Sequence, residues 1–101
     1  MNQLINSNKK SIEKACLEHN VRHLYAFGSV LTEKFNKESD IDFIVDFQNV
    51  SLQNHADNYF DLKYLLQEIL ERNIDLLEEK AIKNPYFKNV VFLQMQKVYG
   101  N

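Results

Sequence analysis

The sequence predicts a small α/β (α+β) domain, in which a mixed sheet of three to four strands is flanked by helices. Two observations lead to this fold class. Hydrophobic residues make up 45% and charged residues 26% of the 101 residues, which is the profile of an ordinary globular domain. Segments with helical periodicity also alternate along the chain with short β-prone segments, which is typical of helices packed on a sheet. We therefore expect one domain over residues 1–101.

The first predicted elements are a helix, a strand and a short helical turn. Residues 7–19 form the helix, since apolar side chains recur there at helical spacing. Residues 21–27 are β-prone and end at Gly28. Ser29 then lies where an N-cap would open a brief helical turn that runs to Glu33.

Residues 40–47 are the clearest strand in the sequence. Side chains alternate strictly there, so that Asp40 and Asp42 lie on one face while Ile41 and Phe43 lie on the other. An apolar face opposite a partly acidic face indicates a strand that packs on a core with one face and presents candidate site residues on the other.

The second half of the chain predicts a helix, a strand and a last helix. A leucine-rich apolar stripe indicates a helix over residues 57–72, and residues 74–78 read as a strand. Asn84 and Pro85 are typical of a helix start, with proline at the first helical position. We expect this last helix to continue to about Tyr99.

The composition makes several classes of protein improbable. A net charge of −2 and a pI near 5.9 provide no basic excess for direct nucleic-acid binding. The apolar stretches fall far short of the roughly 20 residues that a membrane helix needs, so no membrane association is expected. No N-terminal segment combines basic residues with an apolar run, and the single cysteine, Cys16, cannot form an internal disulfide. These features predict a cytoplasmic protein.

Three aspartates form the first candidate site. Asp40 and Asp42 are two residues apart on one strand face, about 6–7 Å from each other at the backbone, and their charges repel. A divalent cation, or a pair of cations, would offset that repulsion, and carboxylate oxygens suit Mg²⁺ or Mn²⁺. Asp75 lies in the next predicted strand and would join them if the two strands are neighbours.

Gly28 and Ser29 form the second candidate site. They follow a strand and open a helical turn, where backbone N–H groups and the serine hydroxyl can face an anion. Glycine also permits a close approach of the backbone to a phosphate. Each feature by itself is common, but an anion site beside a metal ion held by carboxylates is what a nucleoside triphosphate requires.

The two sites together carry a family resemblance. Gly28-Ser29, a spacer of ten residues, and Asp40-x-Asp42 resemble the GS-x10-DxD signature of the polymerase-β-like nucleotidyltransferase superfamily. The short chain is similar to the minimal nucleotidyltransferase (MNT) branch of that superfamily, and the resemblance covers about residues 10–99. It implies the polymerase-β-like nucleotidyltransferase fold.

The resemblance also implies roles for individual residues. Asp40 and Asp42 would bind two Mg²⁺ ions, and Asp75 would complete the metal site and help to activate an acceptor hydroxyl. Gly28 and Ser29 would hold the triphosphate of ATP or another nucleoside triphosphate. The implied activity is Mg²⁺-dependent transfer of a nucleoside monophosphate, AMP above all, to a hydroxyl, with release of pyrophosphate.

Members of the MNT branch often pair with an all-helical HEPN protein. In toxin–antitoxin versions the nucleotidyltransferase silences the HEPN ribonuclease by adding AMP to a tyrosine. The resemblance therefore implies a HEPN-type partner and an antitoxin role. The predicted last helix supports a contact surface for such a partner or for a second copy of the chain, because one helix cannot bury all of its large apolar side chains: Tyr86, Phe87, Val90, Val91, Met95 and Tyr99.

Two alternatives remain open from the sequence. Many relatives carry basic residues and a glycine just after Gly-Ser, whereas this chain has Val30, Thr32 and Glu33 there, and positive charge comes from Lys34 and Lys37. This departure favours a non-catalytic antitoxin that acts by occlusion. The other alternative is a transferase that modifies a small molecule, as antibiotic-modifying enzymes do, although such enzymes usually carry an added acceptor domain.

Overall fold

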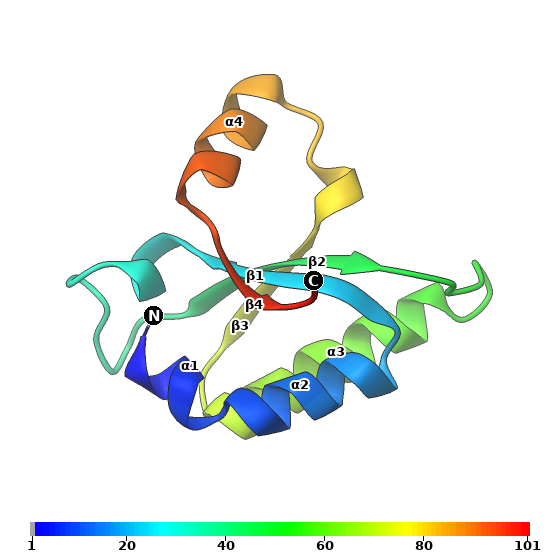
Figure 1. Cartoon of the computed structure of the whole chain (residues 1–101), viewed down its shortest axis with the longest axis horizontal. Helices are drawn as coiled ribbons and strands as arrows, with labels where there is room; N and C mark the ends of the chain where they lie inside the picture. The colour runs from blue at the N-terminus through cyan, green and yellow to red at the C-terminus, as the bar shows by residue number, and fades with distance from the viewer. Residues whose placement is uncertain (1) are drawn as a thin grey trace.

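The computed structural model describes residues 2–101 as a four-stranded sheet with helices on both of its faces (Figure 1). The helices and strands, with two short 3₁₀ helices written η, follow in sequence order: α1 (Gln3–Ser7), α2 (Lys9–Glu18), β1 (Val21–Phe27), η1 (Gly28–Leu31), β2 (Ile41–Phe47), α3 (His55–Leu70), β3 (Ile74–Glu78), η2 (Glu79–Ala81), α4 (Pro85–Gln94) and β4 (Gln96–Tyr99). The predicted fold class is confirmed.

The sheet is mixed, with the strand order β3-β2-β1-β4. Strand β1 runs antiparallel to both β2 and β4, whereas β2 and β3 run parallel. A parallel pair needs a crossover connection, which α3 supplies. The parallel arrangement has one consequence for function, because the beginnings of β2 and β3 meet at the same edge of the sheet.

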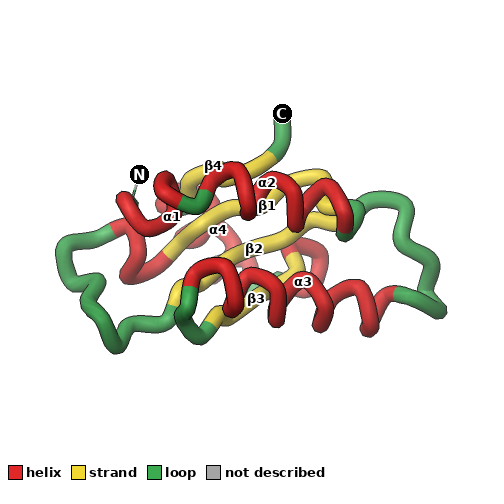
Figure 2. The backbone as a smooth tube through the Cα atoms, turned by 90° about the horizontal axis from the view of Figure 1, so that it is seen from below, coloured by secondary structure: helices red, strands yellow, loops and turns green. Residues whose placement is uncertain are grey.

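Helices α2 and α3 lie over one face of the sheet, as Figure 2 shows. Ile12 of α2 and Leu62 and Leu66 of α3 are completely buried against Phe43 and Val45 of β2. Full burial of one such side chain contributes roughly 1.5–3 kcal/mol. This layer is the main core of the protein, and it confirms the alternation predicted for β2.

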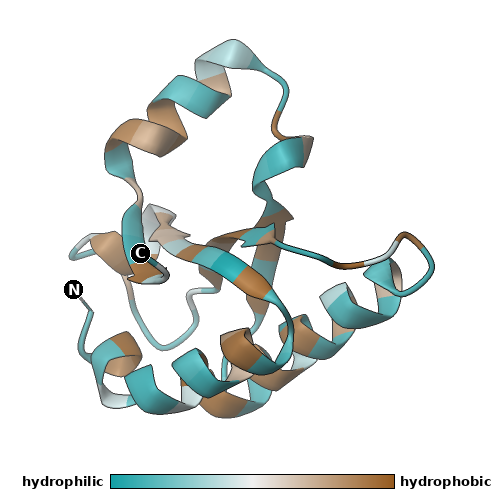
Figure 3. Ribbon diagram, turned by 45° about the vertical axis from the view of Figure 1, so that its right-hand side comes forward, coloured by the Kyte–Doolittle hydropathy of each residue, from teal (hydrophilic) through white to brown (hydrophobic). Residues whose placement is uncertain are grey.

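The opposite face of the sheet is covered by η2 and α4, which connect the edge strand β3 to the other edge strand β4 (Figure 1). A smaller core lies here, formed by Ile44 of β2, Ile82 and Val91. Helix α4 contains hydrophobic segments (Figure 3), and its apolar side chains Val90 and Leu93 are exposed. This face is therefore less completely covered than the face under α2 and α3.

The structure corrects the prediction at both ends of the chain. The last helix ends at Gln94 rather than near Tyr99, and Gln96–Tyr99 form β4, with Tyr99 opposite Leu24 of β1. Strand β4 pairs with the free edge of β1, and a longer helix would leave the backbone groups of that edge without a neighbouring strand. The helix predicted over residues 7–19 is α2, which begins at Lys9 and ends at Glu18, and α1 before it was not predicted.

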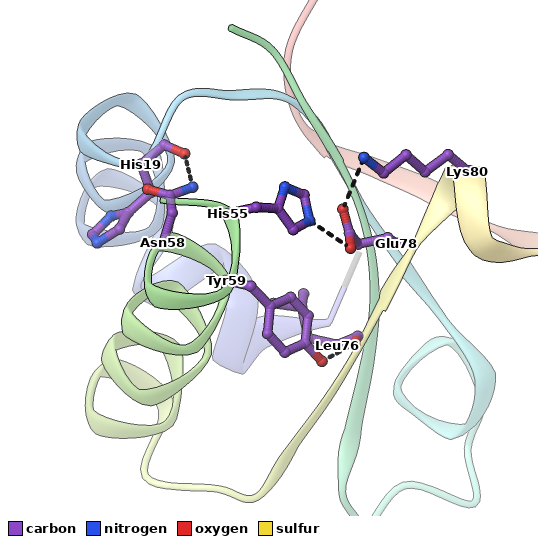
Figure 4. A network of polar contacts seen from close by, with 7 residues as sticks. All are labelled: His19, His55, Asn58, Tyr59, Leu76, Glu78 and Lys80. Carbon is purple, nitrogen blue, oxygen red and sulfur yellow. Dashed lines mark hydrogen bonds and ion pairs between the residues drawn. The ribbon is translucent and has the colours of Figure 1, made fainter. Parts of the chain in front are cut away.

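Polar contacts fasten α3 to β3 (Figure 4). The Tyr59 hydroxyl donates to the backbone carbonyl of Leu76 at 2.5 Å. At Glu78, the last residue of β3, the His55 ring nitrogen Nε2 lies 2.8 Å from Oε2, and Lys80 Nζ lies 3.9 Å from the other oxygen of that carboxylate. These contacts fix the position of β3 along the axis of α3 and so support the register of β3 on β2.

Candidate active site

Asp42 and Asp75 face each other from neighbouring strands. They are register partners in the parallel pair of β2 and β3. Their strand neighbours Ile41 and Ile74 point into the main core, so both carboxylates point to the opposite face, the one that α4 covers in part. The two carboxyl groups are close enough for Asp75 to raise the pKa of Asp42. The sequence placed Asp75 on this face, and the structure brings it to Asp42.

The pKa of Asp42 is raised to about 6. Burial is the largest cause, the hydrogen bond with Asp75 is the second, and the negative charges of Asp75 and Asp40 add to both. A hydrogen bond between two carboxyl groups needs one shared proton, which is consistent with a raised pKa. Ionisation of Asp42 is therefore less favourable than that of an ordinary aspartate, and a bound cation would favour it.

Gly28 lies against the Asp42 carboxylate. Its preceding residue, Phe27, is the register partner of Asp42 in the antiparallel pair of β1 and β2. Gly28 has φ +77°, and a Cβ built on it would lie 2.5 Å from Asp42 Oδ2. Glycine is needed here both for the left-handed backbone and for the space. The sharp turn leads Ser29 into η1, where the Thr32 Oγ1 donates to the Ser29 carbonyl at 2.9 Å.

Asp40 stands apart from this group. It lies one residue before β2 begins and its side chain is exposed, so the strand alternation does not fix where it points. Among residues 2–101, the side chains of His, Cys, Asp and Glu do not form a group of three that closes around one metal position. The structure thus brings Asp42, Asp75 and Gly28 together, and leaves Asp40 at the rim of the group.

The residues present fit a magnesium site of the kind that substrate completes. Mg²⁺ is typically bound by one or two carboxylates together with phosphate oxygens and water, rather than by a cage of protein ligands. Asp42 and Asp75 supply hard oxygen donors side by side, and the exposure of Asp75 leaves one side of the pair open. Gly28 lets the backbone pass close to the Asp42 carboxylate, which fills the space that a side chain at this position would need.

Comparison with known families identifies the chemistry that such a site serves. Residues 9–98, which are most of the chain, match the nucleotidyltransferase domain family. The chain belongs to this family. The resemblance that Gly28-Ser29 and Asp40-x-Asp42 indicated is confirmed, as is the prediction that the chain is a nucleotidyltransferase.

The similarity of the nucleotidyltransferase to known proteins covers most of its length. A protein of Methanocaldococcus jannaschii, described as a candidate protein adenylyltransferase, is 34% identical over 86 residues, which are 84% of this chain and 87% of that protein. The protein adenylyltransferase MntA of Thermococcus cleftensis is 26% identical over 89 residues, which are 87% of this chain and 83% of that protein.

Solved structures share the fold of the nucleotidyltransferase. A crystal structure of a toxin–antitoxin with AMP-PNP contains a chain with a TM-score of 0.72 and 24% identity, covering 93% of this chain and 74% of that one. A structure of tri-AMPylated Shewanella oneidensis HEPN toxin in complex with MNT antitoxin gives 0.66 and 21%, covering 96% of this chain and 73% of that one. Within residues 2–101 of the nucleotidyltransferase, each helix is too short or too polar to cross a membrane.

Sequence reasoning missed one contact that bears on this site. Arg72, at the turn between α3 and β3, donates hydrogen bonds to the backbone of the segment that leads to Asp40. No spacing or motif in the sequence indicates this contact, because the two segments lie far apart along the chain and meet through the fold.

Proposed function

We propose that this nucleotidyltransferase transfers AMP from ATP to a hydroxyl on a HEPN-type partner protein, and thereby acts as the antitoxin of a toxin–antitoxin pair. The observation that carries the proposal is the opposition of Asp42 and Asp75, with the Gly28 backbone packed against the Asp42 carboxylate. The names of the relatives, which are protein adenylyltransferases, support AMP as the transferred group. We also propose that residues 1–101 act as one domain, in the cytoplasm.

The HEPN-type partner is supported by the structural likenesses. The similar chain from Shewanella oneidensis was solved with a HEPN toxin that carries AMP. In the present protein, α4 offers exposed apolar side chains on the same side of the sheet as Asp42 and Asp75, including Tyr86 and Leu93, which are 83% and 86% exposed. A partner bound there would bring its own hydroxyl toward the two carboxylates.

The proposed reaction needs few chemical steps from the protein. The acceptor oxygen forms a bond to the α-phosphorus of ATP, the bond from that phosphorus to the bridging oxygen breaks, and pyrophosphate leaves. Bound Mg²⁺, as two ions or replaced by Mn²⁺, would neutralise charge on the triphosphate. Asp40, Asp42 and Asp75 would hold the cations, and Asp75, the exposed member of the opposed pair, would accept the proton of the acceptor hydroxyl. Gly28 and Ser29 would hold the triphosphate beside Asp42.

One observation favours a second candidate function. The segment after Ser29 contains Val30, Thr32 and Glu33, so positive charge near the expected triphosphate would come from Lys34 and Lys37, both exposed. A protein with weak triphosphate binding would still inhibit a toxin by covering it. The chain would then be a non-catalytic antitoxin.

A transfer assay tests the proposal. The purified chain is incubated with ATP labelled at the α-phosphate, Mg²⁺ and the HEPN-type protein encoded beside it. We expect the label on the partner, and we expect its loss in Asp42→Asn but not in Asp61→Asn, an exposed position on α3. A complex that forms without label would support occlusion instead, and label on an added small molecule would support the antibiotic-type alternative.

A further inference from the structure

Arg72 binds the segment that carries Asp40. Its Nη1 donates to two backbone carbonyls, that of Asn36 at 2.8 Å and that of Ser39 at 3.0 Å. Its guanidinium carbon also lies 4.6 Å from the centre of the Phe35 ring. One side chain at the turn between α3 and β3 therefore contacts three residues of the loop that joins Gly28-Ser29 to Asp40.

The loop depends on this contact because its other hydrogen bonds are local. The backbone N–H of Ser39 donates to the Asn36 carbonyl at 3.1 Å, and the backbone N–H of Asn36 donates to the Ser39 hydroxyl oxygen at 3.0 Å. These bonds close a small turn but do not attach it to the sheet. The Arg72 bonds attach it to the turn before β3, beside the packing of Phe35 on the main core, and a charged donor makes these bonds stronger than neutral ones.

Asp40 is held from both sides by the turn that precedes β3. The carbonyl of Ser39, just before Asp40, accepts from Arg72, and the backbone N–H of Ile41, just after it, donates to the Asn73 carbonyl at 3.0 Å. Two residues after Asn73, the same turn delivers Asp75. The backbone positions of Asp40 and Asp75 are thus set by one short stretch of chain.

We infer that Arg72 is a positioning residue of the nucleotidyltransferase, which holds the backbone of Asp40 at the rim of the site that Asp42 and Asp75 form. The inference rests on the proposed function, in which Asp40 is a metal ligand. Asp40 needs such support because it is exposed, precedes the strand and has no alternation to direct its side chain. The planar guanidinium suits this task, since it stacks on Phe35 while one nitrogen serves two carbonyls, which a lysine ammonium does less well.

Loop order is the first readout, and it needs neither metal nor ATP. Amide hydrogen exchange is compared between the wild type, Arg72→Gln and Arg72→Lys. We expect the amides of residues 35–41 to exchange several-fold faster in Arg72→Gln, with a smaller change in Arg72→Lys. The other arginine of the chain, Arg22, supplies the matched control Arg22→Gln, because Arg22 lies 3.6 Å from Asp46 on the sheet and not at the loop.

Metal binding is the second readout. We expect Arg72→Gln to weaken Mn²⁺ binding about tenfold, as loss of an outer contact to a metal ligand typically does by about 10–100-fold. In the transfer assay the Mg²⁺ concentration for half-maximal rate should rise by a similar factor, Arg72→Lys should recover part of the loss, and Arg22→Gln should match the wild type.

The outcomes separate the two claims. Faster loop exchange with unchanged Mn²⁺ binding would overturn the inference, since Arg72 would then only stabilise the loop. Unchanged loop exchange would also overturn it. Weaker Mn²⁺ binding in Arg72→Gln, in a protein whose wild type transfers no AMP, would support the positioning role while contradicting the proposed function.

Discussion

Asp42 and Asp75 occupy opposed positions on two parallel strands, and Asp75 raises the pKa of Asp42, so that two acidic side chains interact directly within the sheet. Such pairing of like charges directly opposite each other destabilises a sheet. The protein tolerates it at the edge where β2 and β3 begin, beside Gly28. A cation at this point would turn the repulsion into attraction.

Mg²⁺ should stabilise the folded protein through Asp42. A ligand that binds the folded state alone adds about 2.7 kcal/mol of unfolding free energy at 100 times its dissociation constant. We expect the melting temperature of the wild type to rise with added Mg²⁺ or Mn²⁺, and we expect no rise in Asp42→Asn. Asp61→Asn, on the exposed side of α3, should respond as the wild type does. An equal rise in Asp42→Asn would place the metal elsewhere.

Without divalent metal, Asp42 should make the protein less stable as the pH rises. Its pKa is about 6 in the folded state, above the value near 4 expected for an unfolded chain, so the folded state binds more protons between these values. The contribution of Asp42 to the unfolding free energy is therefore favourable below about pH 4 and is lost as the pH passes about 6. Urea titrations in EDTA should show this loss in the wild type, and Asp42→Asn should lack it.

Asp75→Ala should abolish transfer and leave the fold intact. The substitution removes a charge and a hydrogen-bond partner that both raise the pKa of Asp42, so that pKa should fall toward its usual range. Because Asp75 is exposed, we expect a change of less than about 1 kcal/mol in the unfolding free energy. NMR titration of the Asp42 carboxyl gives the pKa. An unchanged value would mean that Asp75 does not face Asp42 in solution.

Gly28→Ala should damage both the fold and the site. The new side chain would adopt a left-handed backbone, at a cost of roughly 1–3 kcal/mol, and would displace the Asp42 carboxylate. We expect a lower melting temperature together with loss of the Mg²⁺ response. Gly100→Ala is the matched control, because Gly100 has φ +111° and lies against Arg22 and His23, away from the acids. It should lower the melting temperature while the Mg²⁺ response persists.

Exposed apolar residues on α4 should mediate association with a partner. Tyr86→Glu and Leu93→Lys alter side chains that are 83% and 86% exposed, so the monomer should fold normally. A stable complex is expected to bury about 1,200–2,000 Å² in total, and light scattering should show it with the HEPN-type protein for the wild type but not for these variants. Leu52→Lys, in the loop before α3 and 94% exposed, should associate normally. Unimpaired association of both α4 variants would move the interface elsewhere.

The central part of the fold was predictable because its signals are local. Strict alternation over β2 identified both the buried face and the acidic face, and Gly28 marked the end of β1. Strand β4 was missed because it is a four-residue edge strand, and its pairing with β1 is a long-range contact that no local pattern encodes. Helix α1 did have a signal, since the Asn2 side chain accepts from the backbone N–H groups of Leu4 and Ile5.

The candidate site was predictable to a similar degree. That Asp75 would lie near Asp42 depended on β3 being the neighbour of β2, which the structure confirms through the parallel register. The position of Asp40 was less predictable, because it precedes the strand and its surroundings come from a distant turn. Arg72 could not be found at all from the sequence, since its hydrogen bonds are to backbone carbonyls, which every residue possesses.

The parallel register of β2 and β3 also determines where the chain can tolerate inserted residues. Side chains alternate between the faces of a sheet, so one residue inserted between Arg72 and Ile74 would turn Asp75 toward the main core and Ile74 or Leu76 toward the acids. The loop between β2 and α3 has no such restriction, because its residues 51–54 are exposed and a longer loop can still lead into α3. Insertions and fused tags should therefore be tolerated near Leu52, whereas a single added residue beside Asn73 that shifts the register of β3 should both dismantle the site and destabilise the main core.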